Sequence, residues 1–259
     1  MNLRHTRNSP NSCEDSTMER MEILRSAIFW KRQISRFRNP DSWGVSVNYI
    51  SQSSRLLNSL EELQNTEFYI DSSLLKEGFR IAEQLAKKIS DSDFPEIWNI
   101  ELKLASYLYS YIMQEKPLIV VETGVANGFS TRVMMAALEQ TGGSLHSFDV
   151  RGECRSVYRG IGKWTFHHVP RKNQMNFLQK NTSNLVVNFW FHDSDHSYLW
   201  QKFEYELAIS RLALNGLLIS DDIDTSEAWI EFCEKEKMLN ISVFDSRKIF
   251  GLAKRPAQF

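Results

Sequence analysis

The sequence predicts an α/β protein in which a mostly parallel sheet carries helices on both faces. From Leu118 onward, short apolar runs that are typical of buried strands alternate with longer helical segments. A glycine-containing turn connects the first of these runs to a helix. The last two runs, 241–245 and 248–254, leave no room for a helix between them, so they are expected to form an antiparallel hairpin.

The N-terminal part of the chain is predicted to be a helical extension. Residues 1–17 are rich in Asn, Ser, Pro and Arg and are expected to form a disordered tail. The extension then covers residues 18–92, with helices expected at 18–38, Ser54–Gln64 and Ser72–Ile89. The helix over 18–38 is basic and amphipathic, and it is expected to pack on its own domain or on a second copy of the chain. An anionic membrane surface or an acidic partner remains an alternative.

A single larger domain is predicted over residues 93–259. Asp93 and Glu96 flank a proline and form a capping box, which predicts a long helix ending near Gln114. Two further helices are expected at Tyr198–Leu212 and Glu227–Lys237. The strands that precede the hairpin are expected at 118–123, 144–149, 164–169, 185–192 and 216–221.

The turn after the first strand is rich in small residues and predicts a ligand site. Glu122 ends the strand, and Gly124 and Gly128 follow before the helix. The dinucleotide pattern G-x-G-x-x-G is not matched, because Ala126 and Phe129 stand at the second and third glycine positions. The phosphate-loop pattern G-x-x-x-x-G-K-[ST] is not matched either. The loop therefore predicts a different ligand that approaches bare backbone.

Acidic residues follow three of the predicted strands. Asp149 ends the second strand, Asp193 and Asp195 follow the fourth, and Asp221 and Asp222 follow the fifth. Parallel strands bring these ends to one edge, where two carboxylates ~4 Å apart repel by about 4 kcal/mol at an effective dielectric of ~20. A bound cation would relieve that repulsion, and oxygen ligands favour Mg²⁺, Mn²⁺ or Ca²⁺.

Helix capping is the alternative explanation for these acids. Asp195 precedes the helix that is expected at Tyr198, and Asp222 or Asp224 precedes the one expected at Glu227. Capping accounts for one acid per helix, whereas the sequence places four acids at these two strand ends.

The glycine loop and the acidic ends of the fourth and fifth strands resemble the motifs of one known family. The pattern E-x-G-x-x-x-G-x-S, which includes Ser130, resembles motif I of class I S-adenosylmethionine-dependent methyltransferases, in the version found in catechol O-methyltransferase. The segment 193–198, Asp-Ser-Asp-His-Ser-Tyr, and the Asp221-Asp222 pair resemble the metal-dependent small-molecule O-methyltransferases that include macrocin O-methyltransferase. The resemblance spans residues 95–255. It implies a Rossmann-like methyltransferase fold with seven strands in the order 3-2-1-4-5-7-6.

The resemblance also implies ligands and roles. A divalent metal, Mg²⁺ or another hard cation, would be held by Asp193, Asp221 and Asp222. The general base would be Asp195, which has the closer family counterpart, or His196, which stands where catechol O-methyltransferase has a lysine. The acceptor would be a hydroxyl group of a sugar, a glycoside or a similar natural product. S-adenosylmethionine would be bound by Glu122, Gly124, Asn127, Gly128, Ser130 and Asp149.

Composition and charge restrict the remaining function classes. A net charge of −1 argues against a nucleic-acid binder. Cys13, Cys154 and Cys233 have neither metal-site spacing nor a disulfide framework, so a reduced cytoplasmic protein is expected. No transmembrane segment or signal peptide is expected. Two alternatives stay open, a non-enzymatic cofactor-binding subunit of a larger assembly and a metal-independent methyltransferase of another acceptor.

Overall fold

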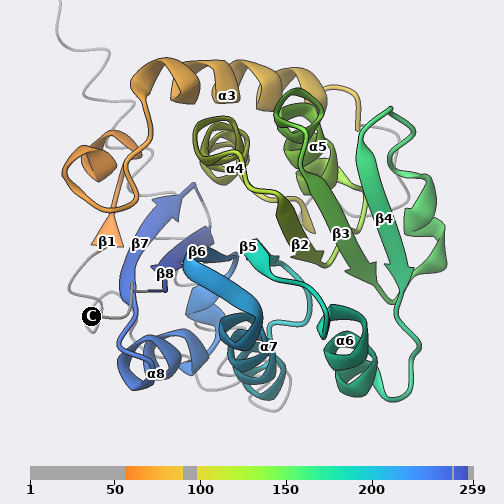
Figure 1. Ribbon diagram of the computed structural model, residues 1–259. Helices are drawn as coiled ribbons and strands as arrows, with labels where there is room; N and C mark the ends of the chain where they lie inside the picture. The colour runs from red at the N-terminus through yellow and green to blue at the C-terminus, as the bar shows by residue number, and fades with distance from the viewer. Residues whose placement is uncertain (1–55, 90–97, 247, 256–259) are drawn as a thin grey trace, which may run out of the picture.

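The computed structural model of the protein describes residues 56–89, 98–246 and 248–255, and the strands among them form a single sheet (Figure 1). Neighbouring strands in this eight-stranded sheet follow the order β1-β7-β8-β6-β5-β2-β3-β4. The strands are β1 (Leu56–Leu57), β2 (Ile119–Thr123), β3 (Ser144–Asp149), β4 (Lys163–His168), β5 (Val187–His192), β6 (Leu212–Ser220), β7 (Leu239–Asp245) and β8 (Lys248–Lys254).

The sheet confirms the predicted fold class and adds one short strand. Read from β4, the seven expected strands lie in the expected order, and β1 is added beside β7 at the edge. The strands β4, β3, β2, β5 and β6 are mutually parallel, whereas β8 is antiparallel to both β6 and β7. The hairpin therefore turns the start of β8 toward the edge where β6 ends.

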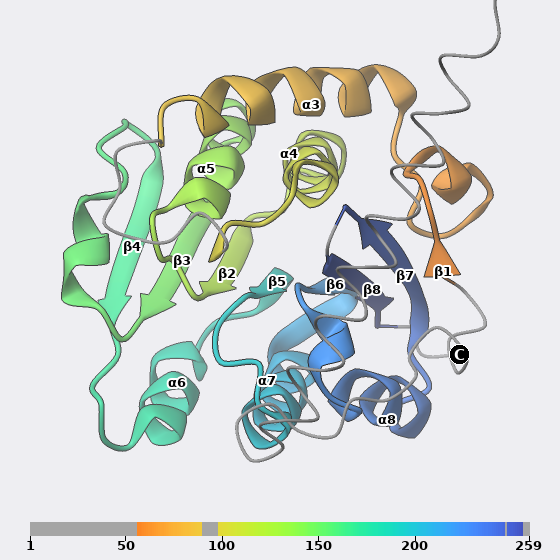
Figure 2. The ribbon, with the colours of Figure 1, turned by 180° about the vertical axis from the view of Figure 1, so that it is seen from behind.

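Helices cover both faces of the sheet in layers (Figures 1 and 2). α4 (Leu102–Glu115) and α5 (Phe129–Thr141) lie on one face, and α3 (Ser72–Ala86) lies across them as an outer layer. The opposite face carries α6 (Gln174–Thr182), α7 (Tyr198–Arg211) and α8 (Ala228–Lys235). Within the described residues, the helices are all too short or too polar to cross a bilayer.

The prediction of a helix at Ser54–Gln64 is wrong. Its described residues form β1 and a short 3₁₀ helix, η1 (Glu61–Asn65). The Glu62 carboxylate accepts hydrogen bonds from the backbone N–H groups of Asn58 and Ser59, at 3.1 and 2.9 Å. These bonds fix a turn just before η1, and the open edge of β7 supplies β1 with a pairing partner. Tertiary pairing thus overrides the local sequence preference on which the helix prediction rested.

The other N-terminal predictions have mixed outcomes. α3 confirms the helix predicted at Ser72–Ile89, and its N-cap is the Asp71 carboxylate, which accepts from Ser73 N–H at 2.8 Å. The long helix begins only at Leu102, where the carboxylate of Asp245 on β7 accepts from the N–H of Leu104 at 2.8 Å. The capping box at 93–96, the tail and the helix over 18–38 lie outside the described residues.

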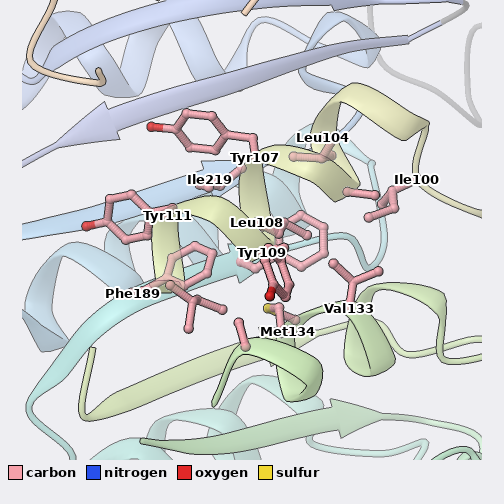
Figure 3. Close-up of a cluster of buried hydrophobic side chains, with 14 of the residues drawn as sticks. Ile100, Leu104, Tyr107, Leu108, Tyr109, Tyr111, Val133, Met134, Phe189 and Ile219 are labelled. Carbon is pink, nitrogen blue, oxygen red and sulfur yellow. The ribbon is translucent and has the colours of Figure 1, made fainter. Parts of the chain in front are cut away.

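The core lies on both sides of the sheet, and α4 is central to it (Figure 3). Tyr107, Leu108 and Ile112 are fully buried, and the rings of Tyr111 and Phe189 meet edge to face at 5.4 Å. Residues that precede α4 share this core, including Leu60, Leu63, Ile70 and Leu75. The described part of the N-terminal extension is therefore packed into the same hydrophobic core as the sheet.

Candidate active site

The loop between β2 and α5 is held by close contacts within the protein. Gly124 and Gly128 have φ of 85° and 79°, as the glycine pattern predicts, and Ala126 between them has φ of 46°. A Cβ at Gly124 would lie 1.9 Å from the carbonyl oxygen of Asp193, and one at Gly128 would lie 2.4 Å from Cβ of Val157. The space that a side chain would take at either glycine is therefore filled by protein atoms.

Asp149 at the end of β3 organises this loop. Its Oδ2 atom accepts hydrogen bonds from the N–H groups of Val125 and Ala126, at 2.8 and 3.1 Å. Its Oδ1 atom accepts from the N–H of Arg151 at 2.8 Å. Asp149 is only half-buried, so it is both a support for the loop and a group at the surface of the site.

The segment just before α4 contacts both the glycine loop and the chain after β3. The sequence analysis did not predict these contacts. Asn127 of the glycine loop is buried, and its side-chain N–H donates to Oδ1 of Asn99. The neighbouring Trp98 is 44% exposed, and the Arg151 guanidinium lies 4.9 Å from its ring centroid. An exposed aromatic ring thus lies against Arg151, two residues after Asp149.

Glu122 lies beneath the loop and has no exposed surface. Its Oε1 accepts from the Ser130 hydroxyl at 2.6 Å, and its Oε2 accepts from Thr131 at 2.7 Å and Ser147 at 2.6 Å. The carboxylate thereby connects β2, the first turn of α5 and β3. Burial raises the pKa of Glu122 to about 7, although the three hydroxyl donors oppose the rise.

Glu122→Gln is expected to remove a pH dependence of stability. Because the folded-state pKa lies above the ordinary value of 4.5, the folded protein holds the extra proton between those pH values. The free energy of unfolding of the wild type should therefore fall, relative to the variant, by about 2–3 kcal/mol between pH 5 and pH 8. Urea unfolding of both proteins at several pH values measures this difference, and a difference that does not change with pH would refute it.

The turn after β5 lies directly beside the glycine loop. The N–H of Asp193 donates to the carbonyl oxygen of Thr123 at 2.8 Å, which joins the ends of β5 and β2. Asp195 is exposed, and its carboxylate accepts from the N–H of Ser197 at 2.8 Å, just before α7. Asp195 is therefore not the N-cap of α7, which is Ser197; its carboxylate instead closes a turn just before the helix.

His196 occupies the centre of the acidic residues. Its Nε2 lies 3.6 Å from Oδ1 of Asp193, and its Nδ1 lies 3.6 Å from Oδ2 of Asp222. The side chain is 12% exposed, and Nε2 has no hydrogen-bond partner among the described residues. Burial opposes a charged imidazole, but the carboxylates of Asp193, Asp222 and Asp221 outweigh it and raise the pKa of His196.

A lysine accompanies the acids that were predicted to hold a metal. Nζ of Lys248 donates to Oδ2 of Asp221 at 2.6 Å and lies 3.1 Å from Oδ2 of Asp222. Asp221 and Lys248 are both buried, so the positive charge that the acids require is already supplied within the chain. No group of three His, Cys, Asp or Glu residues in the described ranges has the arrangement of a metal site. The residues present therefore do not fit the predicted Mg²⁺ ion.

A buried glutamate supports the turn from below. Glu204 on α7 is fully buried and accepts hydrogen bonds from His192 Nδ1 at 3.0 Å, Trp200 Nε1 at 2.7 Å, and the hydroxyls of Ser194 and Thr123. Burial alone would raise the pKa of Glu204, but His192 and these hydroxyls lower it. The hydroxyl of Ser194 therefore helps to hold the turn after β5.

Comparison with known proteins agrees with this arrangement. Residues 121–223, which include the glycine loop and the acidic strand ends, match a family model described as a methyltransferase domain. This segment is therefore similar to methyltransferase domains. The rest of the domain's sheet, β7 and β8, lies beyond the matched residues. No curated protein sequence matches the chain.

Solved structures of methyltransferases share the fold of this chain. An O-methyltransferase from Bacillus cereus in complex with SAH is 14% identical, has a TM-score of 0.54, and aligns over 75% of this chain and 96% of its own. A protein from Staphylococcus aureus, proposed to be a caffeoyl-CoA O-methyltransferase, is 12% identical, with a TM-score of 0.51 and coverage of 76% and 95%. At such low identity the likeness establishes the fold.

Proposed function

We propose that this protein transfers a methyl group from S-adenosylmethionine to a hydroxyl oxygen of a small molecule, such as a sugar or a glycoside. The observation that carries the proposal is the meeting of three strand ends. β2, β3 and β5 are paired in register, which brings the glycine loop, Asp149 and the turn from Asp193 to His196 to one edge of the sheet. The methyltransferase match and the O-methyltransferase structures support the reaction class.

The cofactor would lie against the loop, Asp149 and Trp98. The carboxylate of Asp149 is suited to accept hydrogen bonds from ribose hydroxyls, and the exposed ring of Trp98 offers an apolar face. When bound, S-adenosylmethionine supplies an electrophilic methyl group. Glu122, Ser130 and Asn127 would position the loop from the protein side, because all three are buried.

His196 would be the general base rather than Asp195. The exposed Asp195 carboxylate accepts from Ser197, whereas Nε2 of His196 has no hydrogen-bond partner in the part of the chain that the structure describes. This nitrogen is buried, so an acceptor hydroxyl would have to enter beside the ring; it could then donate to Nε2 and lose its proton to it as the oxygen attacks the methyl group. Asp193 and Asp222 flank the ring and would stabilise the imidazolium that forms.

Calorimetry with S-adenosylhomocysteine tests the cofactor assignment. The wild type should bind it with micromolar affinity, and Asp149→Ala should weaken binding by ~10–100-fold, because a hydrogen bond to a charged group contributes about 1.5–3 kcal/mol. Glu153→Gln is the matched control, since it removes an exposed acidic charge four residues after Asp149. Binding of NAD in place of S-adenosylhomocysteine by the wild type would contradict the proposal.

A further inference from the structure

The buried cluster at the end of β6 contains its own cation. It comprises Asp221, Asp222 and Lys248, with Asp193 and His196 beside them, and we call it the acid–lysine cluster. Lys248 begins β8, which pairs antiparallel with β6 through Ser220 and Gly251. The start of β8 therefore extends past the last residue of β6, which brings Lys248 next to Asp221 and Asp222.

The ammonium of Lys248 is held between carboxylates and away from water. Only 4% of its side chain is exposed, against 1% for Asp221 and 10% for Asp222. Burial by itself would lower the pKa of Lys248, but Asp221, Asp222 and Asp193 outweigh burial and raise it. The lysine is therefore charged at neutral pH, and it balances part of the negative charge in the acid–lysine cluster.

A divalent ion and this ammonium would compete for the same oxygen atoms. Hard cations bind carboxylate oxygens at about 2.0–2.6 Å. The Oδ2 atoms of Asp221 and Asp222 instead face Nζ of Lys248 at 2.6 and 3.1 Å. An ion bound there would have to displace a buried ammonium, or share its oxygens with another positive charge in a medium of low dielectric.

We propose that Lys248 takes the place of the divalent cation, so that the site works without a metal, and that removing its amino group converts the cluster into a divalent-metal site. The statement about catalysis rests on the proposed methyltransferase function, whereas the statement about metal binding does not. The ammonium of Lys248 neutralises Asp221 and Asp222 and holds them in place. The acceptor hydroxyl is then activated by His196 alone, which removes its proton, and no metal is needed to lower its pKa.

Mn²⁺ binding measured by electron paramagnetic resonance tests the structural half. The wild type should bind no Mn²⁺ at ~1 mM, whereas Lys248→Ala should bind one ion with a Kd at least ~10-fold below that concentration. Lys254→Ala, at the other end of β8, is the matched control and should resemble the wild type. Lys248→Ala combined with Asp221→Asn should lose the new site. Far-UV circular dichroism reports that each variant is folded.

Two results would overturn the structural half. The first is that the wild type binds one Mn²⁺ ion and the single variant Asp221→Asn does not. This comparison needs no Lys248 variant. The second is a folded Lys248→Ala that binds no Mn²⁺. If Lys248→Ala does not fold alone, it should fold when Mn²⁺ is added, because an ion that binds only the folded state stabilises it. Failure to fold with Mn²⁺ would count against the proposal as well.

Chelation tests the catalytic half. With an acceptor that supports turnover, excess EDTA should leave the wild-type rate within about two-fold of the untreated rate, since no metal-bound oxygen is required. A rate that falls more than ten-fold and returns with Mg²⁺ would overturn this half. If no hydroxylated acceptor is methylated, the proposed function fails, while the Mn²⁺ results on the acid–lysine cluster remain valid.

Discussion

Replacing His196 by glutamine is expected to slow methyl transfer by ~10²–10⁴-fold, which is the usual contribution of a general base. Glutamine keeps a polar side chain of similar reach between Asp193 and Asp222, but it cannot take up the acceptor proton. Affinity for S-adenosylhomocysteine should not change, because the imidazole lies beside Asp193 and Asp222, which are not among the residues proposed to hold the cofactor. The rate of S-adenosylhomocysteine release and calorimetry provide the two measurements.

Asp195→Asn is the matched control for that experiment. The asparagine side chain can still accept from the N–H of Ser197, so the turn before α7 should be kept and the rate should fall only a few-fold. The opposite pattern, a large loss for Asp195→Asn and a small one for His196→Gln, would make Asp195 the base. Small losses for both variants would show that neither residue removes the proton.

Gly124→Ala is expected to lower the free energy of unfolding by at least about 3 kcal/mol, or to prevent folding. The new Cβ would lie 1.9 Å from the carbonyl oxygen of Asp193, so the ends of β2 and β5 would have to separate. The left-handed φ of 85° adds conformational strain for alanine. Urea unfolding followed by circular dichroism measures the loss.

Gly142→Ala isolates the part of this effect that comes from the backbone angle. Gly142 follows α5 with a φ of 86°, nearly the same as that of Gly124, but a Cβ there would meet no atom within 4 Å. Its substitution should therefore lower stability by only about 1 kcal/mol. Equal losses at the two glycines would mean that contact with Asp193 does not account for the need for glycine at position 124.

Local sequence patterns determined most of the sheet. The strands β2 and β5, for example, lie in short apolar runs bounded by turn residues, and both the hydrophobic pattern and the turn chemistry are properties of neighbouring residues. The absence of a helix between β7 and β8 indicated a hairpin for the same reason. Acids that follow strand ends could also be placed at one edge of the sheet, since parallel pairing puts those ends together.

Contacts between residues far apart in the chain decided the rest. β1 forms because β7 offers an open edge, and α4 begins at Leu102 with its N–H groups turned toward the remote carboxylate of Asp245. Glu122 is a buried residue that holds the glycine loop, because hydroxyl groups from α5 and β3 donate hydrogen bonds to its carboxylate.

The choice between a metal ion and a lysine was of the same kind. The acids at the strand ends indicated a nearby positive charge without specifying its source. Lys248 lies beside Asp221 and Asp222 because antiparallel pairing places the start of β8 beside the end of β6, and this pairing joins residues far apart in the chain. Carboxylate repulsion depends on the distance to every neighbouring charge, and the sequence states the charges without stating those distances.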